Sequence, residues 1–237
     1  IGVTGSSVAN ELAKKSDLVI SVGSRLQDFT TGSNTLISCE MISINVQNHD
    51  VVKHKSISLL GDAKVSVKLI LERINNFHIS KQYQTEINRL KNLWEADVVR
   101  VTSKSDKNSL PSDSEVIGAV NRNVPKDTIV IGAAGSMPGE LHKLWHSGDV
   151  EGYHMEYGFS CMGYEIPAAI GVNLAEPDRP NVIFVGDGSY MMMNSELSTA
   201  VMMGISTTII VTDNRGFGCI NRLQKSTGSE PFNNLFK

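Results

Sequence analysis

Short apolar runs rich in β-branched residues recur along this chain, and they constrain its fold more than any other feature. They lie at residues 17–22, 41–46 and 57–60 in the first part of the chain, and at 128–131, 182–185 and 207–212 in the second. Apolar residues are nearly continuous in most of these runs, a pattern typical of strands that are buried on both faces. We therefore predict an α/β fold with two doubly wound parallel-sheet domains.

The segments between these runs have the apolar spacing of helices. The predicted helices cover residues 4–15, 63–74, 82–101, 115–123, 168–174 and 195–203. A polar stretch at 103–109 interrupts the alternation of strands and helices, and such stretches often connect domains. We expect a first domain at 1–76, a linker with a helix at 77–113 and a second domain at 114–237. Both ends resemble the interior of a domain, so we expect the first domain to be truncated at its start and the second at its end.

Charge and cysteine content exclude several classes of function. The chain has 22 Lys and Arg against 25 Asp and Glu, a net charge of −3, which argues against nucleic acid or an anionic membrane as the main partner. No apolar stretch approaches the roughly 20 residues of a membrane span, and the start lacks a secretory signal. Cys39, Cys161 and Cys219 are far apart and lack metal-ligand spacing. We expect a soluble, cytoplasmic protein.

The last two apolar runs lead directly into Gly-Asp-Gly-Ser at 186–189 and Asp-Asn-Arg-Gly at 213–216. Open α/β sheets place their ligands at the carboxyl ends of parallel strands. The Asp187 carboxylate, the Asn214 amide oxygen and the Gly216 carbonyl are hard oxygen donors, which suit Mg²⁺ holding a diphosphate. Since such residues also dominate ordinary turns, either motif alone leaves a simple turn as the alternative.

The spacing of the motifs favours a cofactor site. Asp187 and Asn214 are 27 positions apart, and the segment between them reads as loop, helix and strand. With Met-Gly-Tyr-Glu-Ile-Pro-Ala-Ala-Ile-Gly at 162–171, the chain resembles the acetohydroxyacid synthase-like family of thiamine-diphosphate enzymes. The resemblance implies that thiamine diphosphate and Mg²⁺ are the cofactors. It also implies that Met162 holds the cofactor bent, and that the Ser160 carbonyl receives its 4′-amino group. The alternative for Met162 is a core methionine.

Other residues complete the predicted site. Gly188 and Ser189 follow the aspartate, where a glycine leaves backbone N–H groups free to face phosphate oxygens. Ser136 either donates to the diphosphate or starts a helix. Glu165 is either an acid that acts on a hydroxylated substrate or a hydrogen-bonded structural residue. His154 lacks a ligand pattern, and a surface or core position is the simpler reading.

The resemblance covers essentially the whole chain. It implies that residues 1–76 are the family's middle, Rossmann-like domain and that residues 114–237 are its domain for the diphosphate and Mg²⁺. It also implies partners. It implies a small-molecule substrate, assembly as a homodimer or homotetramer, and a glutamate from an N-terminal pyrimidine-binding domain of a neighbouring subunit. Nothing in this chain matches that domain, so we expect these residues alone to be inactive. The strings at 25–33, 44–50, 135–145 and 216–224 look closest to the branch that hydrolyses a carbon–carbon bond of a cyclic 1,2-dione in inositol catabolism.

Two alternatives to that branch stay open. One is a 2-oxoacid enzyme like acetolactate synthase or glyoxylate carboligase. The other is a non-catalytic nucleotide-binding module, because a glycine and serine at 5–7 precede a predicted helix and can seat an anion. No Gly-x-Gly-x-x-Gly is present there, which argues against a dinucleotide.

Overall fold

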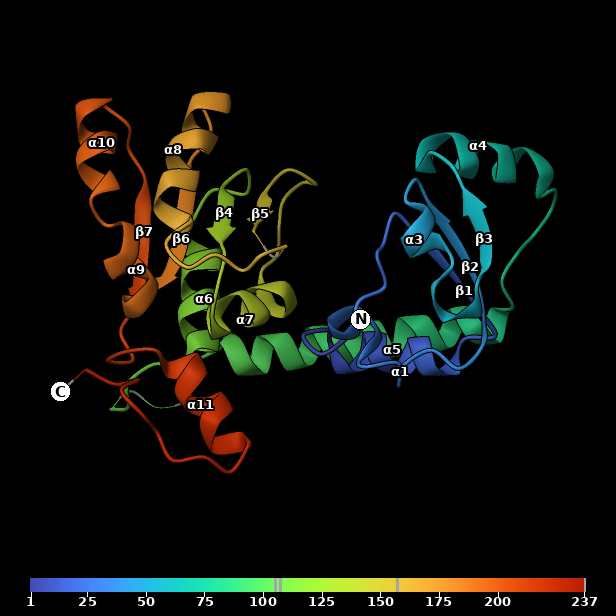
Figure 1. The fold of residues 1–237 in the computed structure, drawn as a ribbon, viewed down its shortest axis with the longest axis horizontal. Helices are drawn as coiled ribbons and strands as arrows, with labels where there is room; N and C mark the ends of the chain where they lie inside the picture. Colours follow the sequence, from blue (N-terminus) through green and yellow to red (C-terminus); the bar gives the residue numbers. More distant parts are fainter. Residues whose placement is uncertain (105, 107, 157, 237) are drawn as a thin grey trace. The chain divides into compact units, whose positions relative to one another are not determined.

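A computed structural model describes residues 1–104, 106, 108–156 and 158–236. The chain divides into two compact units, Ile1–Val99 and Arg100–Lys237, each built on a parallel sheet (Figure 1). The predicted α/β fold with two parallel sheets is therefore confirmed. Of the predicted polar stretch at 103–109, Ser105 and Lys107 lie outside the described residues. No helix in the part of the chain that the structure describes is long and apolar enough to cross a membrane.

The first unit has a three-stranded sheet in the order β1-β2-β3. Its strands are β1 (Leu18–Val22), β2 (Glu40–Asn45) and β3 (Ile57–Leu60). Its helices are α1 (Ser7–Lys15), α2 (Asp28–Thr31), α3 (Asn48–Val51), the short 3-10 helix η1 (Lys53–Lys55) and α4 (Ala63–Arg73), and α5 (Lys81–Thr102) runs from this unit into the next. Apolar side chains from β2 and α3 form its core, including Met41, Ile44 and Val51.

Side-chain caps fix where two helices of this unit, α1 and α4, begin. Ser6 accepts a hydrogen bond from the Ala9 N–H at the start of α1, and Asp62 accepts one from the Val65 N–H at the start of α4. Each cap satisfies a backbone donor that has no partner inside its helix. Helix α4 therefore begins at residue 63 as predicted, whereas α1 begins at Ser7, three residues after its predicted start.

The second unit has a four-stranded parallel sheet in the order β5-β4-β6-β7. Its strands are β4 (Ile129–Gly132), β5 (Tyr153–Met155), β6 (Asn181–Gly186) and β7 (Thr208–Thr212). Its helices are α6 (Asp113–Asn123), α7 (Ser136–Leu144), α8 (Glu165–Ala175), α9 (Asp187–Met193), α10 (Glu196–Met202) and α11 (Gly218–Ser226).

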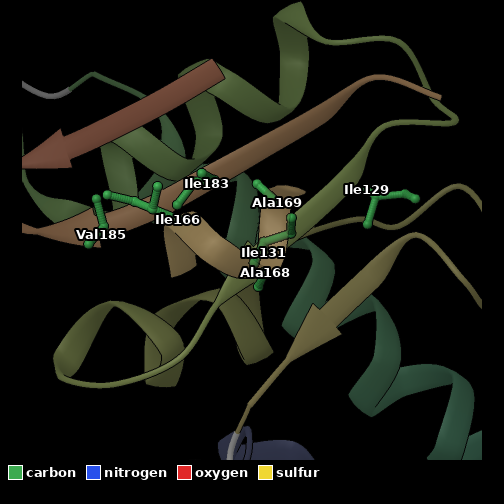
Figure 2. Close-up of a cluster of buried hydrophobic side chains, with 7 residues drawn as sticks. All are labelled: Ile129, Ile131, Ile166, Ala168, Ala169, Ile183 and Val185. Atoms are coloured by element: carbon green, nitrogen blue, oxygen red, sulfur yellow. The ribbon is translucent and has the colours of Figure 1, made fainter. Parts of the chain in front are cut away.

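Both faces of β4 and β6 are covered, as their continuous apolar runs predict, whereas β7 is partly exposed and β3 of the first unit is exposed along its whole length. Alternate side chains of β4 and β6 pack with α8 into one buried cluster, shown in Figure 2, which comprises Ile129, Ile131, Ile166, Ala168, Ala169, Ile183 and Val185. Since successive side chains of a strand point to opposite faces, Phe184 faces the other way, where its ring meets the edge of Trp145 at the end of α7. This apolar packing stabilises β4 and β6, whose ends carry the loops of the site.

The register of β6 and β7 brings two strand ends together. The last pair in this ladder is Gly186 with Thr212. Asp187 and Asp213 therefore both follow directly at the same edge of the sheet, and Asn214 comes one residue later. The position of the predicted ligand set follows from this pairing.

The structure corrects one local prediction near that edge. The sequence reads as a loop directly after Gly186, whereas helix α9 begins there at Asp187. Tyr190 and the three methionines that follow it are compatible with a helix. They outweigh the single helix-weakening glycine, Gly188, in the first turn.

Candidate diphosphate and metal site

A pocket of about 210 Å³ lies in the second unit, where loops and helix starts follow the carboxyl ends of β4, β6 and β7. Seven of the nine predicted site residues line it: Ser136, Ser160, Met162, Gly188, Ser189, Asn214 and Gly216. Of the other two, Asp187 lies next to the lining residue Gly188 in the chain. Glu165 accepts a hydrogen bond from Ser189, which also lines the pocket. The structure thus brings together residues that are as far apart as 136 and 216 in the sequence.

Asp187 is the first residue of α9, and its two carboxylate oxygens differ. Oδ2 accepts a hydrogen bond from the Gly216 N–H at 2.7 Å. Oδ1 is buried and has no hydrogen-bond partner among the described residues. A buried carboxylate oxygen without a donor is costly, and a cation is the partner that best removes that cost. The surroundings of Asp187 therefore fit the role of a metal ligand.

Asn214 and Gly216 lie in a tight turn after β7. Asn214 Oδ1 accepts the Gly218 N–H at 3.1 Å, and an amide oxygen has a second lone pair that remains available for a cation. Gly216 has φ +142°, and a Cβ there would lie 2.2 Å from the Asn234 carbonyl oxygen, so only glycine fits. The Phe217 N–H donates to the same carbonyl at 2.7 Å, which holds the turn in place.

A glycine also keeps the start of α9 open. A Cβ on Gly188 would lie 2.8 Å from the Phe217 ring and 3.2 Å from the Gly216 carbonyl oxygen. A side chain at Gly188 would therefore press on both. No group of three His, Cys, Asp or Glu side chains that could hold a metal is found among residues 1–104, 106, 108–156 and 158–236. The predicted set, with one carboxylate, one amide and one carbonyl, is consistent with that result and suits Mg²⁺ better than a softer metal.

The loop before α8 brings Met162 to the pocket. Ser160 has a left-handed backbone with φ +55°, which is uncommon for a residue with a side chain. The Glu156 carboxylate accepts the Phe159 N–H at 2.8 Å and the Cys161 N–H at 2.7 Å, one on each side of Ser160. These bonds hold the pKa of Glu156 below its usual range, chiefly through the Cys161 N–H. A charged acceptor thus stabilises the strained turn.

Glu165 is fully buried at the start of α8 and does not line the pocket. Its carboxylate accepts the Gly163 N–H at 3.1 Å, the Ser189 hydroxyl at 3.0 and 3.2 Å, and the Ala134 N–H at 3.5 Å. Burial raises the pKa of Glu165, and the hydrogen bonds only partly oppose that rise. The Ser189 hydroxyl also accepts the Gly163 N–H at 2.7 Å, so this side chain is already engaged within the protein.

His154 lies on β5 and contacts Tyr164 just before α8. Its Nε2 is 2.7 Å from the Tyr164 hydroxyl, and the two rings stack with centroids 5.8 Å apart. His154 is not among the residues that line the pocket. This geometry agrees with the simpler reading of a packed histidine.

Sequence reasoning missed several residues of the pocket wall. Phe217, Cys219 and Ile220 from the start of α11 line it, as do Gly135 and Met137 around the start of α7. The glycines at 216 and 218 mark the turn before α11. No residue pattern, however, indicates that the apolar side chains beside them face a pocket.

Comparisons with known proteins agree with this geometry. A parallel sheet whose strand ends carry acid, amide and glycine groups around a pocket is the architecture of a diphosphate-binding α/β domain. The family profile described as "Thiamine pyrophosphate enzyme, C-terminal TPP binding domain" matches residues 133–236, and "Thiamine pyrophosphate enzyme, central domain" matches residues 1–74. The chain belongs to the thiamine pyrophosphate enzymes, of which it carries the central and the C-terminal cofactor-binding domains.

Similar proteins of this family share one name. The chain is 40% identical over 263 residues to the 3D-(3,5/4)-trihydroxycyclohexane-1,2-dione hydrolase of Clostridium tetani, covering all of this chain and 41% of that protein. It is 40% identical over 260 residues to the hydrolase of the same name from Geobacillus thermodenitrificans, covering all of this chain and 40% of that protein. This chain therefore spans about two fifths of the length of these relatives.

Proposed function

We propose that this chain is part of a thiamine-diphosphate-dependent hydrolase that opens the ring of 3D-trihydroxycyclohexane-1,2-dione in myo-inositol degradation. The observation that carries the proposal is the 40% identity, across the whole chain, with the Clostridium tetani hydrolase named for that substrate. The pocket of the second unit supports the cofactor assignment, because seven of the residues expected around thiamine diphosphate line it.

Asp187 Oδ1, Asn214 Oδ1 and the Gly216 carbonyl are the proposed ligands of Mg²⁺, which anchors the diphosphate. Asp187 Oδ1 is a buried acceptor without a hydrogen-bond partner among the described residues. The other two groups lie in the turn whose Gly216 N–H donates to Asp187. Backbone N–H groups at Gly188 and Ser189, with the Ser136 hydroxyl, are the proposed donors to phosphate oxygens.

Met162 and Ser160 are assigned to the other part of the cofactor. Both line the pocket. The Met162 side chain is proposed to keep the two rings of the cofactor folded together, and the Ser160 carbonyl to accept its 4′-amino group. When bound, thiamine diphosphate supplies a carbanion that adds to a carbonyl carbon and accepts the electrons of the broken carbon–carbon bond.

The overall reaction consumes one water molecule. Cleavage between the two adjacent carbonyl carbons of the ring leaves one of them as a carboxylic acid and the other as an aldehyde, which gives 5-deoxy-glucuronic acid. Burial keeps Glu165 away from the pocket surface, so we do not assign it contact with the substrate.

The intact protein is proposed to be a cytoplasmic homodimer or homotetramer. The chain has three free cysteines, Cys39, Cys161 and Cys219, which is consistent with a reducing compartment. The family's pyrimidine-protonating glutamate belongs to an N-terminal domain of a neighbouring subunit, so residues 1–237 alone are expected to lack turnover.

Titration calorimetry of the full-length protein with thiamine diphosphate and Mg²⁺ tests the cofactor site. Asp187→Ala should abolish Mg²⁺-dependent binding. Asp213→Ala is the matched control, because its carboxylate is at the neighbouring strand end but accepts the Arg215 N–H, at 2.8 Å, and is not a proposed metal ligand. Unchanged binding in Asp187→Ala would overturn the assignment and would favour a nucleotide-binding module.

Product analysis tests the substrate. The full-length protein with both cofactors should convert the cyclic dione to an open-chain aldehyde acid and should leave pyruvate and glyoxylate unchanged. Formation of acetolactate from pyruvate, or of a coupled product from glyoxylate, would instead assign the protein to the 2-oxoacid enzymes.

A further inference from the structure

Two carboxylates hold the loop that carries Ser160 and Met162, one from each side. Glu156 bonds the backbone N–H groups of Phe159 and Cys161, and Glu165 bonds the N–H of Gly163. Three N–H groups around Met162 thus end on carboxylate oxygens, the strongest acceptors that side chains offer.

The two glutamates occupy different environments. Glu156 is partly accessible to water, whereas Glu165 is completely buried. A buried carboxylate is tolerated only if donors surround it. Glu165 meets this condition with donors from three different segments, which are the loop after β4 at Ala134, the Met162 loop at Gly163, and α9 at Ser189.

The inner carboxylate therefore connects three walls of the pocket. Gly163 N–H is shared between Glu165 Oε2 at 3.1 Å and Ser189 Oγ at 2.7 Å. Ser189 follows the proposed metal ligand Asp187 by two residues in the same helix. A shift of the Met162 loop would thus break bonds that also fix the start of α9.

We propose that Glu156 and Glu165 are positioning residues that clamp the loop 158–163, so that the Ser160 carbonyl and the Met162 side chain are placed before the cofactor binds. The inference rests on the proposed function, because it takes this loop as the one that faces the cofactor. Neither glutamate lines the pocket, and each acts through the backbone that it holds.

The donor and acceptor geometry gives the two sites different responses to glutamine. At Glu165, a glutamine oxygen can accept the Gly163 N–H while its amide donates to Ser189 Oγ, since a hydroxyl can rotate to accept. Only the long contact from the Ala134 N–H, at 3.5 Å, loses its acceptor. At Glu156, both partners are N–H donors. One of them would then face the glutamine amide, so Glu156→Gln satisfies only one of the two.

The test compares full-length variants that are shown to be folded. Glu165→Ala and Glu156→Ala should each speed hydrogen exchange of the amides in 158–163 by about three- to tenfold without cofactor, the scale expected for one lost hydrogen bond. The affinity for thiamine diphosphate with Mg²⁺ and kcat should fall together, with little change in the substrate KM. Glu165→Gln should restore most of these losses and Glu156→Gln only part of them.

Glu176→Gln is the matched control, because Glu176 is exposed at the other end of α8. If the wild type binds thiamine diphosphate but the folded alanine variants keep wild-type exchange and affinity, the clamp is overturned while the proposed function stands. If the wild type does not bind the cofactor, the proposed function fails instead. Should Glu165→Ala not fold, the glutamine variant and both Glu156 variants decide the question.

Discussion

Asp187 and Gly216 are joined across two strand ends by a hydrogen bond of 2.7 Å from the Gly216 N–H to Asp187 Oδ2. This bond fixes the carboxylate so that the other oxygen, Oδ1, remains buried and unpaired among the described residues. The folded protein thus holds an acceptor ready at the place where a cation is proposed to bind.

Asp187→Asn should weaken metal binding without destabilising the fold. Its amide oxygen can keep the bond to Gly216 N–H, which leaves a nitrogen where the cation needs an oxygen. Thermal stability without metal should stay within about 1 kcal/mol of wild type, while Mg²⁺-dependent cofactor binding should weaken by at least about tenfold, the scale seen when even outer partners of a metal are removed. Calorimetry and thermal unfolding measure both, with Asp213→Asn as the control. Equal affinity in both variants would contradict the role of Asp187.

Gly163→Ala should destabilise the protein by about 1–3 kcal/mol. Gly163 has φ +88°, and a Cβ there would lie 2.7 Å from Met193 Cγ. Gly171→Ala is the matched control, because Gly171 lies inside α8 with nothing within 4 Å of an added Cβ. It should stabilise by about 0.5–1 kcal/mol, since glycine weakens a helix interior. Urea unfolding of both variants decides whether the backbone at Gly163 matters.

Glu165 should make stability fall as pH rises. Burial raises its pKa above the ordinary value of 4.5, so the folded protein keeps the proton longer than the unfolded chain does. The contribution is fully present below that ordinary pKa and is lost as pH rises through the raised one, with a slope of at most about 1.4 kcal/mol per pH unit. Glu165→Gln should remove this slope when unfolding free energies are measured from about pH 4 to about pH 8, a range that starts near the ordinary carboxyl pKa.

Glu156 provides the control of opposite sign. Its pKa is lowered, chiefly by the Cys161 N–H, so its contribution is present above its ordinary pKa and is lost as pH falls through the lowered one. Glu156→Gln should therefore lower stability near neutral pH, where the wild-type carboxylate is charged, and should change stability little in acid. Parallel pH curves for the wild type and both glutamine variants would show that neither carboxylate titrates as the structure indicates.

Met162→Ala should lower kcat of the full-length protein by about 10²-fold, because small displacements of reacting groups have effects of that order. The substrate KM should change little, and Met162→Leu should retain most of the activity because it keeps the bulk of the side chain. Met202→Ala is the control, since Met202 is 83% exposed on α10. Equal activity of the Met162→Ala and Met202→Ala variants would show that Met162 only packs in the protein interior and does not position the cofactor.

Much of the site could be predicted because parallel strands end at one edge. The runs that became β6 and β7 place Asp187 and Asn214 together whatever the details of the chain between them. The role of Glu156 could not be predicted. Its partners are backbone N–H groups whose direction depends on the left-handed conformation of Ser160, which no sequence pattern indicates.

The sequence indicates helix α7 only as one alternative for Ser136 and does not predict strand β5, each for a physical reason. Helix α7 contains Pro138 and Gly139, which usually interrupt helices, but a proline in the first turn loses no hydrogen bond. Strand β5 has only three residues, Tyr153–Met155, and none is β-branched. The placement of the domain boundaries at 76 and 113 stays a prediction.

The pairing of Gly186 with Thr212 has a consequence for how distant relatives are recognised. An inserted residue within β6 or β7 would turn the following side chains to the opposite face of the sheet. An inserted residue in the turn between α10 and β7 would leave that pairing intact. Searches that demand 27 positions between the aspartate and the asparagine would therefore overlook proteins with longer turns, whereas searches anchored on the two strand ends would find them.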